Sequence, residues 1–393
     1  MSQVHNLKSS KKTMRSLEDL LNSSQDRQFL QLSGIYTDSK DFKGHLQPPV
    51  LPGLSQALSL ENSKVIYSGQ QLYVDYRQSV LAKVFALQEF ERSPGINAFF
   101  IWTDTDRSGS DKLITKLKWP NHEEGIRFIS DKTDALEIRY VQVDVIKLKK
   151  AFDQLSSFVL EDKQHSESKL VRLQNLREAV LPQKTETLAA FNYKLTEFFF
   201  RHQVGYFPKS VLQSSLLEQD FLIEQVNDFL NQRIAVIHEF NSAIGELQQK
   251  EINPQVSPLG EDYLPLHYTC LRDYRRLRLV HEQDGKSHFA TATCKCGETY
   301  RFHLGTNLLS LEELTTTKHW SLDVCFPIFL NDFVSGYVAG KSSALYGLVL
   351  NRVLEKALGK RPIPIYVPSN LGKNCGEQVD SLVYSYFNES TTP

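Results

Sequence analysis

The sequence lacks a long apolar run, an excess of charge of either sign, and a rich set of cysteines. No apolar stretch in its 393 residues approaches the roughly 20 residues that cross a bilayer, so we expect no membrane contact through a spanning helix. Residues 1–15 are polar and have no apolar centre, which does not fit a signal peptide. The 45 basic and 46 acidic residues almost cancel, and this balance argues against nucleic acid as the main partner.

The number of cysteines indicates the compartment of the protein, and the absence of known motifs excludes several classes of enzyme. Five cysteines in a chain of this size argue against a disulfide framework and favour a reducing compartment, so we expect a cytoplasmic protein. The sequence has no Ser-His-Asp order, no His-Glu-x-x-His and no Gly-x-Gly-x-x-Gly. The commonest signatures of hydrolases, zinc proteases and dinucleotide binding are therefore absent.

The patterns that are present predict an α/β protein. A strand is expected at 64–67, a helix near 76–91 and a continuously apolar strand at 98–102, with two further strands at 126–130 and 138–145. Near the other end, a strand at 337–339 precedes a helix with apolar residues at helical spacing, and a last strand follows at 364–368. Strands that alternate with helices are typical of a parallel, Rossmann-like sheet.

Changes in amino-acid composition and pattern along the sequence divide it into five parts. Residues 1–30 are expected to be a mobile N-terminus with a short helix at 17–21, and 31–146 the first half of the Rossmann-like core. Residues 147–252 are almost all helix-forming and predict a helical insertion, with 210–250 as its longest helical stretch. A connecting segment with cysteines spans 253–310, and 311–393 completes the core.

Three predicted turns follow strands of this sheet and carry residues that bind ligands. Parallel sheets place ligands at the carboxyl ends of their strands, so we expect the three turns to share one pocket. The predicted substrate- or nucleotide-binding residues are Ser68, Gly69, Gln70, Gln71, Thr103, Tyr337, Gly340, Lys341, Ser342 and Ser343. Asp104 and Asp106 are the candidate catalytic bases, and the same turn could instead orient a polar substrate, bind an ammonium, hold Mg²⁺ or simply cap the next element.

The glycine turn at 340–343 has two interpretations. A glycine beside a lysine at the start of a helix suits a phosphate or a carboxylate, because the first amides and the helix dipole favour negative charge. The stretch is not a P-loop, since three residues rather than four separate its glycines. The alternative is an ordinary helix start that Ser342 or Ser343 caps.

The cysteines at 270–296 predict a metal site. Zinc prefers four tetrahedral ligands, and Cys270, Cys294 and Cys296 supply three. Asp273, in a Cys-x-x-Asp arrangement, is the candidate fourth ligand, with His267 or His303 as alternatives. We expect any zinc to be structural; the alternative is a knuckle that folds without metal.

These motifs, in this order, resemble those of the cysteine-adding enzymes of bacillithiol biosynthesis. That family has a Rossmann-like core similar to class I aminoacyl-tRNA synthetases. The resemblance spans about residues 64–368 and is carried by Gly69-Gln70-Gln71, Phe100–Asp106, Gln255-Val256, the stretch from Pro327 to Asp332, Tyr337-Val338-Ala339-Gly340 with Tyr346, and Ile363–Pro368.

The resemblance implies a ligase that joins cysteine to glucosaminyl-malate through an amide bond, with ATP or another nucleotide as a cofactor. The sequence departs from the family in Lys341-Ser342-Ser343 after Gly340, which suggests a more anionic ligand. The cysteine cluster is not a usual family feature, and the C-terminal coiled coil that makes the family's dimer is missing.

Two other functions compete with this expectation. One is a synthetase-like enzyme that activates a different acid through an adenylate, motivated by Lys341 and the cysteine cluster. The other is a non-catalytic protein that binds small molecules in the same fold, motivated by the long helical region and the altered glycine turn.

Overall fold

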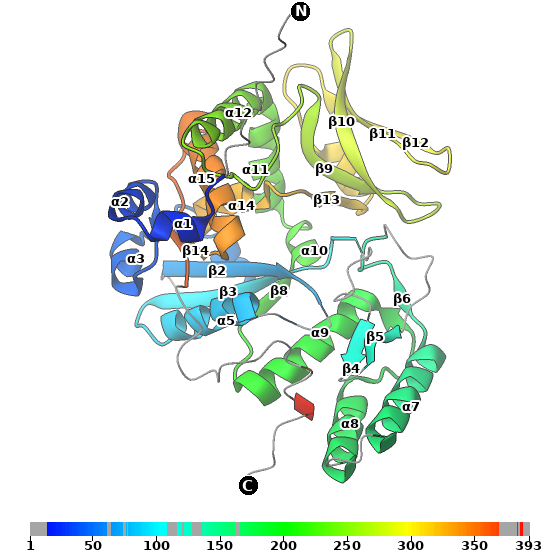
Figure 1. The fold of residues 1–393 in the computed structure, drawn as a ribbon. Coiled ribbons are helices and arrows are strands. Elements are labelled where there is room, and N and C mark those ends of the chain that lie inside the picture. Colours follow the sequence, from blue (N-terminus) through cyan, green and yellow to red (C-terminus); the bar gives the residue numbers. More distant parts are fainter. Residues whose placement is uncertain are drawn as a thin grey trace, which may run out of the picture.

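The centre of the molecule is a six-stranded parallel sheet (Figure 1). The computed structural model describes residues 14–60, 64–73, 76, 78–107, 116–119, 122–127, 136–161, 166–368, 383, 386 and 387. The strand order is β1-β15-β14-β2-β3-β8, and every neighbouring pair is parallel. The strands are β1 (Ile35–Tyr36), β2 (Lys64–Gln71), β3 (Ile96–Thr103), β8 (Ser210–Leu212), β14 (Gly336–Val338) and β15 (Ile365–Tyr366). The predicted α/β class and a parallel sheet built from distant parts of the chain are confirmed.

The adjacent strands β2 and β3 have apolar middles because helices cover both faces of the sheet. Neighbouring residues of a strand point to opposite faces. Val65 and Tyr67 of β2 therefore pack in one core, and Ile66 packs in the other with Phe100 of β3. All four side chains are no more than 2% exposed. Continuous apolar runs of this kind are typical of strands in parallel sheets.

Different helices cover the two faces (Figure 1). Helix α5 (Gln78–Glu91) contacts β2, β3 and β14. On the opposite face α15 (Lys341–Lys356) packs against β15 and against α12 (Arg233–Gln249). The smaller helices around this core are α3 (Ser39–His45), α4 (Gly53–Ala57), α13 (Glu312–Thr316) and α14 (Phe326–Phe329).

Two short helices form within the part of the predicted mobile N-terminus, 1–30, that the structure describes. Residues 1–13 lie outside the described part. Helix α1 (Leu17–Leu21) begins at Ser16 with a capping box, and α2 (Ser24–Leu32) follows. Leu17 and Leu20 are buried in the core that contains α12 and α15, so apolar contacts keep this segment on the body of the protein.

The predicted helical insertion is only partly helical. It contains α7 (Val145–Glu161), α8 (Ser166–Val180), α9 (Leu188–Phe199), a π-helical turn (Phe200–Val204), α10 (Gln213–Leu216), α11 (Asp220–Asn231) and α12. The prediction of one long helical stretch over 210–250 is wrong at its start, because β8 lies there and pairs with β3 as an edge strand of the parallel sheet. Two short strand pairs lie near α7 and α9: β4 (Lys116–Trp119) with β5 (His122–Arg127), and β6 (Gln142–Val143) with β7 (Glu186–Thr187).

The predicted connecting segment forms a second, antiparallel sheet. Its strands are β9 (Tyr263–Thr269), β10 (Arg276–Asp284), β11 (Ser287–Thr293), β12 (Thr299–Gly305) and β13 (Trp320–Leu322), in the order β12-β11-β10-β9-β13. The boundary predicted at 310 is therefore wrong, because β13 belongs to this sheet rather than to the parallel core. In the described part of the chain no helix has both the length and the apolar character that crossing a membrane requires.

Candidate functional site

A cleft of about 560 Å³ lies where β2, β3 and β14 end. The parallel core contributes the end of β2, the turn after β3 and the start of α15, while the antiparallel sheet and the α14 region form the other wall. The predicted residues among those lining it are Gly69, Gln70, Gln71, Thr103, Asp106, Tyr337 and Ser343. Segments from three distant parts of the sequence are thus brought together at one end of the sheet, which is where parallel sheets place ligands.

The glutamines that were predicted to form a turn are the last residues of β2. Ser68 to Gln71 pair in parallel with Phe100 to Thr103. Ser68 does not line the cleft; its hydroxyl is buried and donates to the carbonyl of Val338 at 2.7 Å, which ties β2 to β14. Its role is to hold the sheet together rather than to contact a ligand.

A buried lysine on α5 donates hydrogen bonds to the end of β2. Lys83 of α5 is 5% exposed, and its Nζ donates to the carbonyl oxygen of Gly69 at 2.6 Å and to Oε1 of Gln70 at 2.9 Å. Burial lowers the pKa of Lys83 from 10.5 to about 7. Because Oε1 of Gln70 accepts from Lys83, the amide nitrogen is the end of Gln70 that can donate to a ligand.

Gln71 and Asp106 meet inside the cleft. Nε2 of Gln71 donates to Oδ2 of Asp106, and the hydroxyl of Tyr73 donates to Oε1 of Gln71. The other oxygen of Asp106, Oδ1, lies 3.5 Å from the guanidinium of Arg276 on β10. This carboxylate is therefore fixed from both walls of the cleft.

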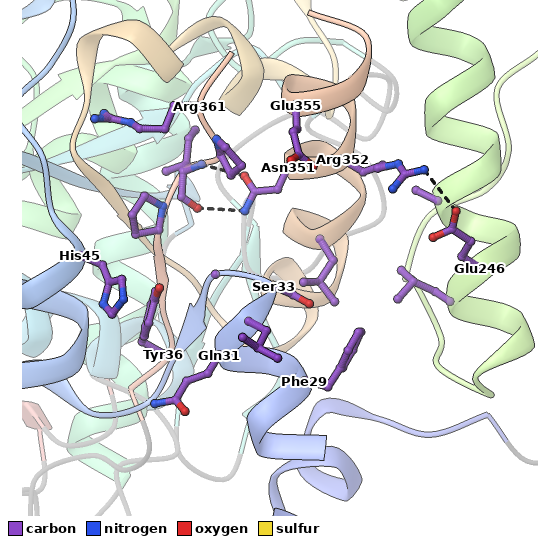
Figure 2. Close-up of a pocket in the computed structure, with 18 of the residues that line it drawn as sticks. Phe29, Gln31, Ser33, Tyr36, His45, Glu246, Asn351, Arg352, Glu355 and Arg361 are labelled. Carbon is purple, nitrogen blue, oxygen red and sulfur yellow. Dashed lines mark hydrogen bonds and ion pairs between the residues drawn. The ribbon is translucent and has the colours of Figure 1, made fainter. Parts of the chain in front are cut away.

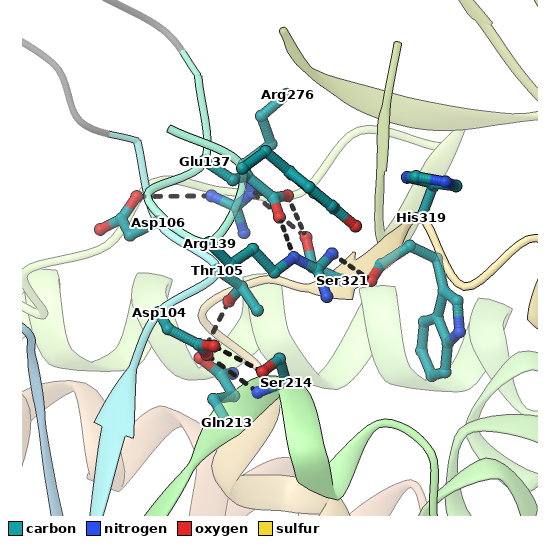
Figure 3. Close-up of polar contacts among 12 residues, drawn as sticks. Asp104, Thr105, Asp106, Glu137, Arg139, Gln213, Ser214, Arg276, His319 and Ser321 are labelled. Carbon is teal, nitrogen blue, oxygen red and sulfur yellow. Dashed lines mark hydrogen bonds and ion pairs between the residues drawn. The ribbon is translucent and has the colours of Figure 1, made fainter. Parts of the chain in front are cut away.

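Asp104 does not face the cleft, contrary to its predicted catalytic role. It is 1% exposed, and its carboxylate accepts from the backbone N–H of Ser214 at 2.9 Å and from the Ser214 hydroxyl (Figure 3). Burial raises the pKa of Asp104, and the bonds from Ser214 partly offset this effect. The side chain anchors α10 to the end of β3, and Asp106 is the acidic residue of this pair that a ligand can reach.

Of the predicted ligand-binding residues in the glycine turn at 340–343, only Ser343 lines the cleft. Gly340 is the N-cap of α15, and the hydroxyl of Ser343 donates to the Gly340 carbonyl at 3.1 Å. Neither predicted serine caps the helix through its side chain. Lys341 and Ser342 are exposed and do not line the cleft, and Nζ of Lys341 forms an ion pair with Glu18 of α1. The predicted contact of Lys341 with an anion in the pocket is therefore not made by this arrangement.

Buried hydroxyls in the cleft were missed by sequence reasoning. The hydroxyls of Tyr67 and Tyr346 have less than 1 Å² of exposed area and no hydrogen-bond partner within the described residues. Burial raises the pKa of both groups well above 10.0. The rings of Tyr67 and Tyr337 stack with centroids 4.8 Å apart. Tyr67 precedes Gly69 by two residues and so shares its face of β2, which is the signal that could have found it. Buried polar atoms are rarely left unpaired, so these two hydroxyls are free to bond to a water or to a ligand group.

His267 and Arg276 enter the cleft from the antiparallel sheet and were also missed as cleft residues. Burial, followed by the charges of Arg276, Arg278 and Arg107, lowers the pKa of His267 to about 2, so the ring is neutral. Its Nδ1 is buried without a partner among the described residues. Arg276 also donates from its Nε to the hydroxyl of Ser321 at 3.3 Å and from an Nη to the carbonyl of Leu322 at 3.0 Å.

Four groups at one end of the antiparallel sheet can hold a metal ion. Their ligand atoms, from Cys270, Asp273, Cys294 and Cys296, all lie within 4.8 Å of one another. The Sγ atoms of Cys270 and Cys296 are 3.6 Å apart, and Cys294 Sγ lies 3.3 Å from both Asp273 carboxylate oxygens. Sulfur ligands at zinc distance from a tetrahedral ion would be about 3.8 Å apart.

The two alternative fourth ligands are excluded by their positions. His267 lines the cleft, and neither it nor His303 belongs to the cluster. The ring of His303 packs edge-on against Phe289, with centroids 5.3 Å apart. Cys325 is buried outside the cluster, and Cys375 lies outside the described residues.

A second cavity of about 450 Å³ lies at the opposite end of the parallel sheet, between α2, α12 and α15 (Figure 2). Gly34 and Pro364, which directly precede β1 and β15, are part of its wall. Among its charged side chains, Arg352 pairs with Glu239 and Glu246. Because this cavity is at the amino ends of the strands, whereas parallel sheets place ligands at the carboxyl ends, the first cleft is the better candidate site.

Comparison with known proteins does not assign the chain to a family. No protein-family model matches the chain, and no curated protein matches it either.

Proposed function

We propose that the chain is an enzyme of the ligase type that joins the carboxyl group of an amino acid, cysteine, to the amine of a sugar-malate acceptor in low-molecular-weight thiol biosynthesis. The proposal treats the parallel sheet as a Rossmann-like core. The observation that carries it is the meeting of Gly69-Gln70-Gln71, Asp106 and Tyr337 in one cleft. These residues belong to the motifs that resemble the cysteine-adding family, and they are far apart in the sequence.

The cleft offers groups suited to both halves of amide formation. An amide forms from a carboxylate only when the acyl group is activated and the attacking amine is deprotonated. The carboxylate of Asp106 is the candidate base, because it lines the cleft and is held by Gln71 and Arg276. The amide nitrogen of Gln70 and the unpartnered hydroxyls of Tyr67 and Tyr346 are candidate donors to the substrate carboxylate.

ATP or another nucleotide is the proposed activating cofactor. The support is the start of α15, whose 16 residues follow a glycine and whose first backbone amides have no partner within the helix. Such a helix start attracts phosphate through its N–H groups and its dipole. The ion pair of Lys341 with Glu18, outside the pocket, removes one of the two features that motivated the adenylate alternative, and the cysteine cluster remains.

Zinc is the proposed ion of the cysteine cluster, and its role is structural. Three cysteine sulfurs and one carboxylate, with ligand atoms within 4.8 Å of one another, are a ligand set that Zn²⁺ accepts. The cluster lies at the β9–β10 and β11–β12 turns, and its four residues are not among those that line the cleft. Free thiols at such spacing persist in a reducing compartment, so we place the protein in the cytoplasm.

The proposal is tested by incubating the purified protein with L-cysteine and glucosaminyl-malate, with and without ATP, and detecting the amide by mass spectrometry. We expect product from the wild type and a loss of about 100-fold or more in Asp106→Asn, if Asp106 is the base. Lys286→Ala is the control, because it removes an exposed charge between β10 and β11 without touching the cleft or the start of α15. Absence of amide under all conditions would reject the ligase, and tight binding of cysteine or ATP without turnover would favour the non-catalytic alternative.

A further inference from the structure

The cysteine cluster joins two hairpins of the antiparallel sheet. Cys270 and Asp273 lie in the turn between β9 and β10, while Cys294 and Cys296 lie in the turn between β11 and β12. One ion bound to all four would tie the two turns to each other. Besides the contacts within the cluster, the backbone N–H of Leu271 donates to the hydroxyl of Tyr300 at the start of β12 at 3.0 Å. At exposed positions, an Nη of Arg272 donates to the carbonyl of Cys296 at 3.4 Å and pairs with Glu298 at 3.6 Å.

The first of these turns has a backbone that needs support. Tyr274 has φ of 56°, a left-handed conformation that is unfavourable for a residue with a side chain. The turn is closed by the N–H of Tyr274 donating to the Cys270 carbonyl at 2.9 Å and by the N–H of Cys270 donating to Arg275 at 2.9 Å. A metal ion on Cys270 and Asp273 would bind both ends of this strained turn.

The same turn contacts the segment 136–140 of the parallel-sheet domain. Arg275 forms an antiparallel bridge with Leu136, and the ring of Tyr274 lies 6.2 Å from that of Tyr140. A shift of the turn would therefore reach this segment directly.

The segment 136–140 in turn holds the acidic turn of the cleft. The N–H of Ile138 donates to the carbonyl of Asp106 at 3.0 Å, and the N–H of Arg139 donates to the carbonyl of Asp104 at 3.3 Å. A continuous series of backbone contacts thus runs from Asp273 to Asp106.

A second, side-chain connection runs through Arg276, which follows Asp273 by three residues (Figure 3). Its guanidinium lies 3.5 Å from Asp106 and 3.4 Å from Glu137. Glu137 is fully buried, pairs with Arg139 at 2.7 Å and accepts from the Ser321 hydroxyl at 2.9 Å. Arg276 is the first residue of β10 and directly follows the turn at 270–275, which contains Cys270 and Asp273. A shift of this turn would therefore move Arg276.

We propose that the metal ion acts as a positioning element for the cleft: bound by Cys270, Asp273, Cys294 and Cys296, it fixes the turn that delivers Arg276 and holds segment 136–140, and so fixes Asp106. This inference rests on the proposed function, because it takes zinc as the ion and the cleft as the substrate site. It adds that zinc, although remote from the substrate, controls the geometry of the candidate base.

The test is hydrogen–deuterium exchange of the full chain with its zinc content measured by inductively coupled plasma mass spectrometry. Zinc-loaded protein is compared with protein stripped by a chelator and with stripped protein given zinc again. We expect exchange in 101–107 and 136–143 to rise by about tenfold on stripping, which lies within the usual range of coupling between sites, and to return with zinc. Helix α12, at 233–249, should not change and serves as the internal reference.

Variants separate metal loss from general damage. Cys294→Ser should lose zinc and reproduce the stripped pattern, while Cys325→Ser, at a buried cysteine outside the cluster, should keep zinc and protection. Asp273→Cys supplies a fourth thiolate and should need more chelator before exchange rises.

Three results would overturn the inference: no zinc in the purified wild type, faster exchange limited to 270–275 and 294–298, or α12 exchanging in step with 136–143. None of these readouts requires amide formation. A chain that couples zinc to the cleft but makes no product would refute the proposed function alone, and a chain that makes product without zinc would refute only the coupling.

Discussion

Lys83 makes the stability of this protein depend on pH in a defined direction. Its pKa falls from 10.5 in the unfolded chain to about 7 in the folded protein, because burial disfavours the charged amine. Between these two values the unfolded chain binds more protons than the folded protein, so the free energy of unfolding rises with pH. Well below pH 7 both states are protonated, so Lys83 no longer changes the free energy of unfolding with pH.

The magnitude follows from the two pKa values. From pH 7 to pH 8.5 the contribution of Lys83 to the free energy of unfolding increases by about 2 kcal/mol. Lys83→Met removes this titration together with the bonds to Gly69 and Gln70. The difference in unfolding free energy between wild type and variant should therefore grow by that amount over this range.

Urea unfolding followed by circular dichroism at several pH values measures the difference. Lys341→Met, which removes an exposed lysine, is the matched control and should run parallel to the wild type. If the wild type and Lys83→Met gave parallel profiles from pH 7 to 8.5, the amine would not be buried under the end of β2, and the account of how Gln70 is oriented would fail.

Four further substitutions test the packing around the site. Tyr67→Phe and Tyr346→Phe remove buried hydroxyls without partners, so each should leave thermal stability unchanged or raise it by up to about 1 kcal/mol while lowering activity; a clear loss of stability would show that the hydroxyls are bonded. Glu137→Gln leaves two guanidiniums facing a neutral group and should lower the free energy of unfolding by about 3 kcal/mol in urea titrations; an unchanged midpoint would contradict the buried network. Gly336→Ala places a Cβ 2.7 Å from Cζ of Phe42, so thermal unfolding should show a loss of about 1–3 kcal/mol, and wild-type stability would refute this close contact.

Local patterns were sufficient to predict the centre of the fold. The apolar run at 98–102 corresponds to β3, and the helical spacing after Gly340 corresponds to α15. Both could be predicted because burial on two faces of a sheet, or on one face of a helix, produces a recognisable pattern of apolar residues along the sequence. The strand β8 has three residues, too few to interrupt a helix-forming stretch. The antiparallel sheet was missed because its hairpins alternate only weakly between buried and exposed residues.

The positions of the turns could be predicted, but the directions of their side chains could not. Parallel strands bring their carboxyl ends together whatever lies at them. The direction of Asp104 is set by Ser214, 110 residues later, and that of Lys341 by Glu18, 323 residues earlier. Arg276 reaches the cleft from a different sheet, and no spacing within the core motifs indicates it.

The central claim is that the end of β2, the turn after β3 and the start of α15 form the binding site for substrate. A crystal structure of the protein soaked with L-cysteine and glucosaminyl-malate tests it most directly. The account predicts ligand density in the cleft, within hydrogen-bonding distance of Gln70 and Asp106. Density in the cavity between α2, α12 and α15, with the cleft holding none, would contradict it.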